Sequence, residues 1–262
     1  MASIENLRKF HNGIKFHLIS DAASHFSHPA LMDVAVGRGG DMFKWKKCGI
    51  KMVFGFDSHI FSIKEAIYRL NRVLKTDKNL PYIKYYVLDM FDQDILTKIA
   101  EKEKNIKGLY NEDGINKYNI VSCQFALHYF CQTDEILNIT LRNISTKLKQ
   151  GGYFIGTATD GDKIQNLDTS FENSTLQINK IDQTCYTFNI SSGSTETYFD
   201  IKGQSTEFLL KKDVFIKIAN QNSLKLVNIN EFENYYQSSD FILTTEEQLI
   251  SFLNFSFIFI KE

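Results

Sequence analysis

The strongest constraint on the fold is the stretch LMDVAVGRGGDMFKWKKCGI at residues 31–50. Here an apolar run gives way to three glycines in four positions and then to a basic, aromatic segment. The apolar run is typical of a buried strand, and the segment after the glycines is typical of a helix. Glycines between a strand and a helix let a ligand approach bare backbone at the positive end of the helix dipole. The stretch therefore predicts a nucleotide-type binding site.

The next apolar run, MVFGFD, ends in Asp57 and completes a strand–helix–strand unit, which is the connection of parallel strands. The alternation continues, with strands expected at 30–36, 52–57, 82–89, 118–124 and 153–159, and helices at 7–19, 41–49, 61–74, from about 92, and 134–149. This rhythm predicts an α/β fold whose parallel sheet is covered on both faces, with ligands beyond the carboxyl ends of the strands. Asp57, Asp89 and Gln124 lie at those ends.

The helix expected at 134–149 has the clearest boundaries, with Asp134 as its cap and Gly151 and Gly152 as its terminators. The polar stretch at 105–117 is expected to be a loop. From about residue 161 the pattern changes to short strands, followed by a helix and two strands that complete the sheet. These elements are expected at 174–178, 184–190, 195–201, 205–210, 212–221, 224–230 and 255–262. We expect one domain over 1–262, made of a helical segment (1–28), a ligand-binding core (29–160) and a final segment (161–262).

The formal net charge of −1 argues against broad electrostatic adhesion to a nucleic acid, so any RNA contact should be local. Four cysteines, at positions 48, 123, 131 and 185, lack metal-ligand spacing and are expected to be reduced intracellular thiols. The two histidines of HFSH at 25–28 have no neighbouring ligand residues, so no metal site is expected. Without a membrane-length apolar run or a signal-peptide pattern, a soluble protein inside the cell is expected.

The glycine loop departs from the dinucleotide fingerprint, because Met42 stands where the third glycine should follow Gly37 and Gly39. Asp57, about twenty positions after the loop, suits a ribose with two free hydroxyls. With no pyrophosphate to hold, a site for S-adenosylmethionine fits best. The alternative is a turn whose glycines only ease the packing of strand against helix.

The strings DVAVGRGGDMFKW, GFD, VLDMF, SCQFALHYF and LKQGGYFIGT occur in this order. Together they resemble the eukaryotic and viral mRNA cap guanine-N7 methyltransferases, and QFALHY is the most specific of them. The likeness extends to FHNGIK and to the segment that begins STEFLLKKD. The AT-rich composition is most similar to the methyltransferase end of multifunctional capping enzymes of large cytoplasmic DNA viruses such as African swine fever virus.

The resemblance implies a Rossmann-like class I S-adenosylmethionine-dependent methyltransferase fold. It has a mainly parallel seven-stranded sheet with helices on both faces and an additional β-rich cap-binding segment. The implied cofactor is S-adenosylmethionine, with S-adenosylhomocysteine as product. The matching cofactor positions are Lys15, Gly37, Gly39, Asp57, Asp89 and Gln124. Asp33 and Asp41 flank the loop and are candidates for the positive methionine end, or, alternatively, for caps of the next helix.

The resemblance also implies a guanosine-binding set, at Asn12, Phe125, His128, Tyr129 and Glu207. Arginine and lysine suit phosphate oxygens, so Arg38, Lys44 and Arg69 are candidates for the cap triphosphate. Three positions depart from the family pattern. Ala35 and Val36 replace glycine and cysteine, and Asn254 stands where an aromatic is usual, which leaves Tyr235 or Tyr236 to compensate.

The implied reaction is methylation of cap guanine N7, with no catalytic side chain, because N7 carries a lone pair and no proton. Alignment of the reacting atoms and electrostatics would suffice. The alternatives are another class I methyltransferase, acting on a small molecule or an RNA ribose, or a non-catalytic subunit of the same fold. Implied partners are the capped 5′ end of mRNA, upstream triphosphatase and guanylyltransferase domains and a stimulatory subunit, with no membrane. The expected location is the cytoplasm (viral factory or virion) for a viral protein and the nucleus otherwise.

Overall fold

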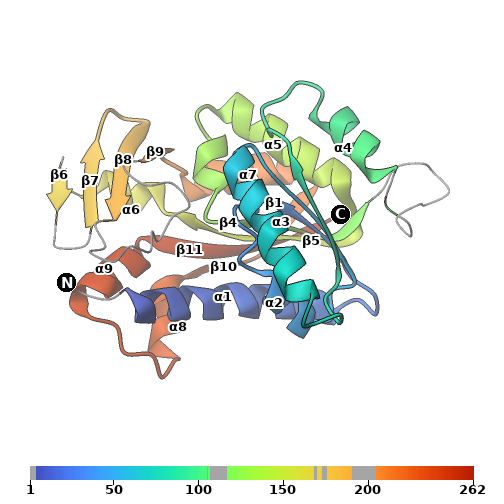
Figure 1. Cartoon of the computed structure of the whole chain (residues 1–262). Coiled ribbons are helices and arrows are strands. Elements are labelled where there is room, and N and C mark those ends of the chain that lie inside the picture. The colour runs from blue at the N-terminus through green and yellow to red at the C-terminus, as the bar shows by residue number, and fades with distance from the viewer. Residues whose placement is uncertain (1–3, 105, 107–116, 168–169, 173–175, 191–204) are drawn as a thin grey trace.

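A computed structural model describes residues 4–104, 106, 117–167, 170–172, 176–190 and 205–262 of the chain (Figure 1). Its centre is a seven-stranded sheet in the order β10-β11-β5-β4-β1-β2-β3. β1 to β5 are parallel, whereas β11 pairs antiparallel with both β5 and β10. The strands are β1 (Ala30–Val34), β2 (Met52–Asp57), β3 (Tyr82–Val87), β4 (Tyr118–Gln124), β5 (Leu148–Thr159), β10 (Leu224–Glu231) and β11 (Asn254–Lys261).

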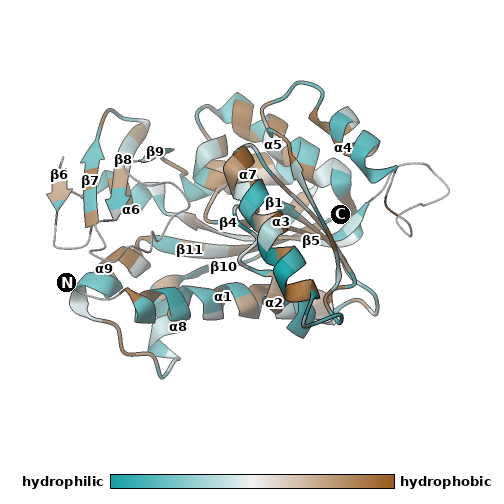
Figure 2. Cartoon of the chain, in the orientation of Figure 1, coloured by the Kyte–Doolittle hydropathy of each residue, from teal (hydrophilic) through white to brown (hydrophobic). Residues whose placement is uncertain are grey.

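Helices cover both faces of this sheet, which leaves the apolar strands between two polar outer layers (Figure 2). One face packs against α4 (Ile95–Glu103), α5 (Asp134–Lys147) and α7 (Lys212–Gln221). The other packs against α1 (Glu5–Ser24), α2 (Met42–Lys47), α3 (Ile60–Leu74) and α8 (Phe232–Gln237). Central strands buried on both faces explain why the sequence of β1 and β2 is continuously apolar rather than alternating.

A second sheet has four antiparallel strands in the order β6-β7-β8-β9. They are β6 (Ser170–Glu172), β7 (Leu176–Lys180), β8 (Cys185–Ile190) and β9 (Ser205–Phe208). This sheet shares an apolar cluster with the start of α1, α6 (Gly161–Gln165) and α9 (Thr245–Phe252). β9 lies against the short 3-10 helix η1 (Leu127–Phe130), which follows β4. The small sheet is thereby placed beside the exit of β4.

The predicted fold class is confirmed, including the seven-stranded sheet, the helices on both faces and the extra β-rich segment. Two boundary predictions were wrong. Thr133, not Asp134, caps α5, since its hydroxyl accepts the Ile136 amide. Gly151 and Gly152 lie within β5, which starts at Leu148, directly after α5, so they do not terminate that helix.

Some elements were not predicted, and some predictions cannot be compared. The short helices α6, α8 and α9 and the strand β6 were missed, and α4 starts at Ile95 rather than near residue 92. The strand expected at 195–201, and most of the loop expected at 105–117, lie outside the described residues. The four cysteines are free thiols. In the part of the chain that the structure covers, no helix is long and apolar enough to span a bilayer.

Candidate functional site

The glycine loop turns sharply between β1 and α2, as its sequence predicts. Gly37 and Gly39 have φ values of 54° and 67°, in the left-handed region that favours glycine. A Cβ at Gly39 would lie 2.6 Å from the Tyr85 hydroxyl oxygen, so this position is closed to larger residues. Ala35 has φ 56°, so it occupies the same region at a steric cost. The departure from glycine at Ala35 therefore strains the backbone without changing its course.

The acids expected at the carboxyl ends of the strands do lie along one edge of the sheet. Asp57, which ends β2, accepts hydrogen bonds from the amides of Gly37 (3.0 Å) and His59 (2.8 Å), and thus ties the loop to the next strand. Asp89 follows β3 and accepts from the Phe91 amide at 3.0 Å. Parallel pairing of β1, β2 and β3 explains why residues so far apart in sequence share this edge.

Gln124 ends β4 at the same edge. Its amide nitrogen donates to the Ser122 hydroxyl and its amide oxygen accepts from the Thr157 hydroxyl, both at 3.2 Å. The Thr157 hydroxyl oxygen also accepts from the Phe125 amide at 3.0 Å. Phe125 itself has φ 55°. This network holds the chain at the exit of β4, so the ring of Phe125 leaves the sheet in a fixed direction.

Two lysines meet on Asp41, which is 7% exposed. Lys15 from α1 lies 2.8 Å and Lys44 from α2 lies 2.7 Å from its carboxylate, and Lys44 also donates to the Asn12 side chain at 2.8 Å. Burial disfavours the charged carboxylate, but the two ammonium groups more than offset this and lower the pKa of Asp41 to about 2. The alternative of a helix cap does not hold for Asp41, because its side chain makes no capping hydrogen bond to α2.

Asp33, in β1, is the most perturbed acid of the site. It is 4% exposed, and burial together with the nearby Asp41 carboxylate raises its pKa to about 8. At neutral pH the side chain is therefore mostly protonated, although a bound cation would favour its charged form. A buried acid held near its titration point beside a glycine loop is typical of a functional site.

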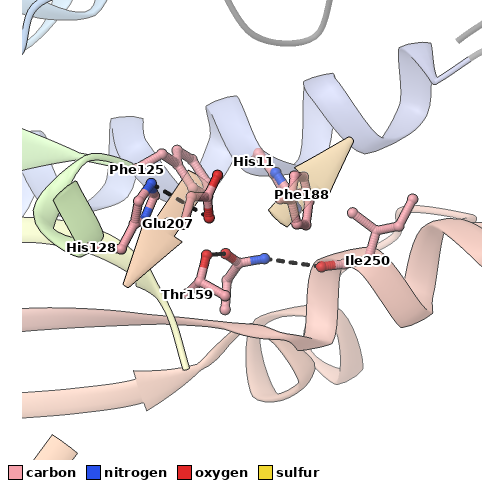
Figure 3. A pocket seen from close by; sticks show the side chains of 8 residues that line it. His11, Phe125, His128, Thr159, Phe188, Glu207 and Ile250 are labelled. Carbon is pink, nitrogen blue, oxygen red and sulfur yellow. Dashed lines mark hydrogen bonds and ion pairs between the residues drawn. The ribbon is translucent and has the colours of Figure 1, made fainter. Parts of the chain in front are cut away.

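A second group of side chains encloses a cavity of about 20 Å³ between α1, the exit of β4, the small sheet and α9 (Figure 3). This volume is enough for roughly one water molecule. The lining side chains come from six separate parts of the chain. They are His11, Phe125, His128, Thr159, Phe188, Glu207, Ile250 and Asn254.

Glu207 is the charged group of this cavity and is 2% exposed. It accepts from the Tyr186 hydroxyl at 2.7 Å and from the Ser205 hydroxyl at 2.9 Å. The Nε2 atom of His128 lies 3.6 Å from its carboxylate (Figure 3). Neither ring nitrogen of His128 has a hydrogen-bond partner among the described residues. Burial lowers the pKa of His128, and Glu207 only partly opposes this, so the ring is neutral at pH 7.

Some predicted contacts lie elsewhere. Tyr235 and Tyr236 are not among the side chains that line the cavity, and the compensation for Asn254 by either tyrosine stays a prediction. The Tyr235 hydroxyl meets Ser256, and Tyr236 packs against Phe10. Asn254 donates to two backbone carbonyls at the end of α9, so its amide serves the local structure.

Arg69, Arg38 and Tyr129 lie beside the two groups. Arg69 donates to the backbone carbonyl of Arg38 at 3.0 Å and so braces the glycine loop from α3. Tyr129 contacts the ring of His128, with centroids 4.3 Å apart, from outside the cavity lining. Among the described residues, no group of three His, Cys, Asp or Glu side chains could hold a metal ion.

Sequence reasoning missed His11 and Phe188. His11 stacks on Phe125 with centroids 5.2 Å apart, and its Nε2 lies 3.0 Å from the Ser251 hydroxyl. Phe188 reaches the cavity from β8. His11 could have been considered because it precedes the candidate Asn12 on α1. Phe188 is an isolated phenylalanine in a short strand, and its sequence context does not indicate a site.

Comparison with known proteins identifies the family of this architecture. A family model described as the mRNA (guanine-N(7))-methyltransferase domain matches residues 1–251. The mRNA cap guanine-N(7) methyltransferase of Caenorhabditis briggsae is 33% identical over 163 residues, which cover 60% of this chain and 40% of that protein. A probable mRNA-capping enzyme of Acanthamoeba polyphaga mimivirus is 30% identical over 172 residues, which cover 61% of this chain and 14% of the enzyme. The match thus spans well under two thirds of either relative.

Solved structures identify the fold. Magnesium protoporphyrin IX methyltransferase from Synechocystis, with bound S-adenosylhomocysteine, covers 100% of this chain and 89% of its own. It superimposes with a TM-score of 0.55 at 13% sequence identity. At this identity the likeness defines the fold, which is that of the class I S-adenosylmethionine-dependent methyltransferases, as predicted.

Proposed function

The chain belongs to the mRNA (guanine-N(7))-methyltransferase family, and from this premise we propose that it transfers a methyl group from S-adenosylmethionine to N7 of the guanosine cap of mRNA. The observation that carries the proposal is that Glu207 and His128 face one another in one cavity. This cavity has to widen to admit guanine, because its present volume of about 20 Å³ holds roughly one water molecule. A buried carboxylate and a buried imidazole, whose nitrogens have no partner among the residues that the structure describes, match the hydrogen-bonding groups of guanine. The family membership and this cavity therefore support the same substrate.

The residues at the edge of the large sheet fit S-adenosylmethionine. Gly37 and Gly39 turn the loop through left-handed backbone, a Cβ at Gly39 would clash, and Asp57 follows at the position suited to ribose hydroxyls. We propose that Asp89 accepts from the adenine amino group, that Gln124 borders the cofactor, and that Asp33 and Lys15 meet the ammonium and carboxylate of its methionine end. The raised pKa of Asp33 supports this role, because burial and the Asp41 carboxylate outweigh the effect of Lys15, so a bound cation would stabilise the charged carboxylate.

Guanine recognition is assigned to the second group. The carboxylate of Glu207 has about four acceptor positions, of which Tyr186 and Ser205 use two. Two acceptor positions remain, which match the ring N–H and the exocyclic amino group of guanine. The neutral ring of His128 is a suitable donor to the guanine carbonyl oxygen. Phe125 and Phe188 supply aromatic surface in place of the residue usual at Asn254.

Five further cap contacts are proposed for residues outside the cavity lining. Asn12 lies one residue after His11, and Tyr129 lies beside His128. Lys44, Arg38 and Arg69 surround the glycine loop and suit the cap triphosphate. In this arrangement Lys44 would bind phosphate oxygens as well as Asp41. Arg69 would bind them as well as the Arg38 carbonyl.

Catalysis needs no general base in this proposal. Bound S-adenosylmethionine supplies a methyl group already activated on a sulfonium. Guanine N7 has a lone pair and no proton to lose. The residues of this chain therefore contribute by fixing the base in the plane set by Glu207 and His128, which holds N7 toward the cofactor edge of the sheet. The surrounding carboxylates tolerate the positive charge that guanine acquires.

We extend the proposal to organisation and partners. The single domain 1–262 comprises a helical segment (1–28), a cofactor-binding core (29–160) that also carries Phe125 and His128, and a segment (161–262) that brings Glu207 to the cap and completes the sheet. The capped 5′ end of mRNA is the substrate, with triphosphatase and guanylyltransferase domains and a stimulatory subunit as partners. A viral factory or virion in the cytoplasm is the proposed location for a viral chain, in line with the mimivirus relative, and the nucleus otherwise.

The test is methyl transfer from labelled S-adenosylmethionine to RNA that ends in unmethylated GpppG. The same RNA already methylated at guanine N7 is the control. Label on the unmethylated cap alone supports both the cofactor and the acceptor atom. Equal labelling of both RNAs would contradict N7 as the acceptor, and no labelling of either, despite cofactor binding, would contradict the activity of the chain alone.

A further inference from the structure

The outward face of α3 carries an alternation of aromatic and basic side chains that the proposed site does not use. Phe61, Lys64, Tyr68 and Arg72 follow one another at intervals of three, four and four positions, which places them on one face of a helix. We call these four residues the α3 stripe. All four are exposed, and Phe61 and Tyr68 are 67% and 62% exposed. A patch of large rings exposed to water indicates a binding surface, whereas buried rings are ordinary core residues.

The orientation of the stripe is fixed by the opposite face of the helix. Ile63, Ala66 and Leu70 are buried in the core beneath the large sheet. The helix therefore cannot turn to bury its outer rings. In Figure 1, α3 lies on the surface in front of the sheet, and Figure 2 shows hydrophobic and hydrophilic residues alternating along it. Phe61 and Tyr68 are two helical turns apart, or roughly 10 Å along the axis.

The charge of this face favours an anionic partner. The Nζ of Lys64 lies 5.6 Å from the centroid of the Phe61 ring. Within the described chain, neither Lys64 nor Arg72 has a carboxylate partner, and Glu65 is the one acid of α3. Cations beside exposed rings are the arrangement with which proteins hold single-stranded nucleic acid, since the bases stack on the rings and the phosphates meet the cations.

The stripe also lies next to the proposed path of the cap. Arg69, the following residue after Tyr68, sits at the border of the buried face and donates to the Arg38 carbonyl of the glycine loop. Arg38 and Arg69 are the residues proposed above for the triphosphate. A chain that continues from the triphosphate past Arg69 would therefore meet Tyr68 and Arg72 first.

We infer that the α3 stripe binds the nucleotides of the capped RNA that follow the first transcribed one, with bases stacked on Phe61 and Tyr68 and phosphates paired with Lys64 and Arg72. This inference rests on the proposed function. It adds a second, local RNA contact to a chain whose net charge of −1 gives no general attraction to RNA. The contact should tolerate any base sequence, because every base has a face that can stack. A protein partner is the alternative outcome of the test, since aromatic residues and arginine are also enriched at the cores of protein interfaces, although lysine is depleted there.

The test compares two substrates, the cap dinucleotide GpppG and a capped RNA of about ten nucleotides, a length within the usual range for single-strand sites. The variant is F61A/Y68A. The matched control is Y82A, because Tyr82 is also an exposed ring with a lysine, Lys84, 5.4 Å from its centroid. Tyr82 starts β3, so it lies at the amino end of the parallel strands, whereas Asp57 and Asp89 lie at their carboxyl ends.

We expect F61A/Y68A to raise the KM for the capped RNA on the order of tenfold or more, since each stacked base contributes about that factor. The KM for GpppG, and both values for Y82A, should not change. A second variant, K64Q/R72Q, should reduce the slope of log affinity for capped RNA against log salt by about 0.7 for each phosphate that no longer pairs with a cation. A KM for RNA that is unchanged, or that rises equally with the KM for GpppG, would overturn the inference and leave the stripe to a protein partner.

The result remains decisive if the proposed function fails. If the unsubstituted chain methylates neither substrate, the proposed activity is contradicted. The stripe is then tested alone by the binding of fluorescent single-stranded RNA, measured by anisotropy. Weaker RNA binding by F61A/Y68A than by the unsubstituted chain would support the stripe. Equal binding would overturn it.

Discussion

Glu207→Gln gives the sharpest test of how the cavity recognises guanine. The carboxylate of Glu207 accepts from Tyr186 and Ser205 and keeps two acceptor positions, which we propose accept from the two guanine donors. Glutamine has one acceptor oxygen, so one guanine donor would lose its partner and face an amide N–H₂ group. Losing a charge-assisted hydrogen bond costs about 1.5–3 kcal/mol, and leaving a buried donor unpaired costs about 1–3 kcal/mol more. The sum of about 2.5–6 kcal/mol corresponds to a loss of on the order of a hundredfold to ten-thousandfold.

The assay is kcat/KM for RNA ending in GpppG, together with the Kd of S-adenosylmethionine by calorimetry. We expect kcat/KM for the cap to fall as calculated and the cofactor Kd to stay the same, because Glu207 lies in the small sheet and not at the glycine loop. Tyr186→Phe removes one donor but keeps the carboxylate, so its loss should be closer to tenfold. If Glu207→Gln weakens cofactor and cap equally, the division into two binding groups is refuted.

Three further predictions concern the glycine loop and β1. The pKa of Asp33 is raised from 3.8 to about 8, so its contribution to stability is present below pH 4 and is lost as the pH rises through 8. Urea unfolding should therefore find Asp33→Asn more stable than the parent by on the order of 5 kcal/mol at pH 9, and little different at pH 4. Ala35→Gly should raise the free energy of unfolding by about 1 kcal/mol, since φ is 56°, and an unchanged value would refute the strain. Gly39→Ala should destabilise by about 1–3 kcal/mol, and Tyr85→Phe, which removes the hydroxyl 2.6 Å from the added Cβ, should restore part of this in the double variant.

The ends of the parallel strands show how far sequence reasoning reaches. Continuous apolar runs define central strands, and glycines or acids directly after them mark the carboxyl ends. In a parallel sheet those ends share one edge, so the proximity of Asp57, Asp89 and Gln124 follows from connectivity alone. The helix predicted at 134–149 and observed at Asp134–Lys147 was found from the helical spacing of its apolar residues. Its cap was misassigned by one residue because Thr133 and Asp134 are both capping residue types.

The cavity could not be found in this way. It joins His11, Phe125, Phe188, Glu207 and Asn254. These residues come from different parts of the fold, and the first and last of them lie near opposite ends of the sequence. Their meeting depends on how the small sheet docks against α1 and α9, which no local pattern specifies. Resemblance to the family supplied Phe125 and Glu207, but it gave no reason to select His11 or Phe188.

The sequence by itself determined the alternation of strands and helices, the position of the glycine loop and the edge of the sheet where a cofactor can bind, because these depend on periodicity and chain order. Only the tertiary structure decided the charge states and pairings at that edge. The protonated state of Asp33 and the two lysines on Asp41 arise from burial and from distances across separate elements. Such distances are set by packing, and the free energy of a buried charge depends on all of them at once.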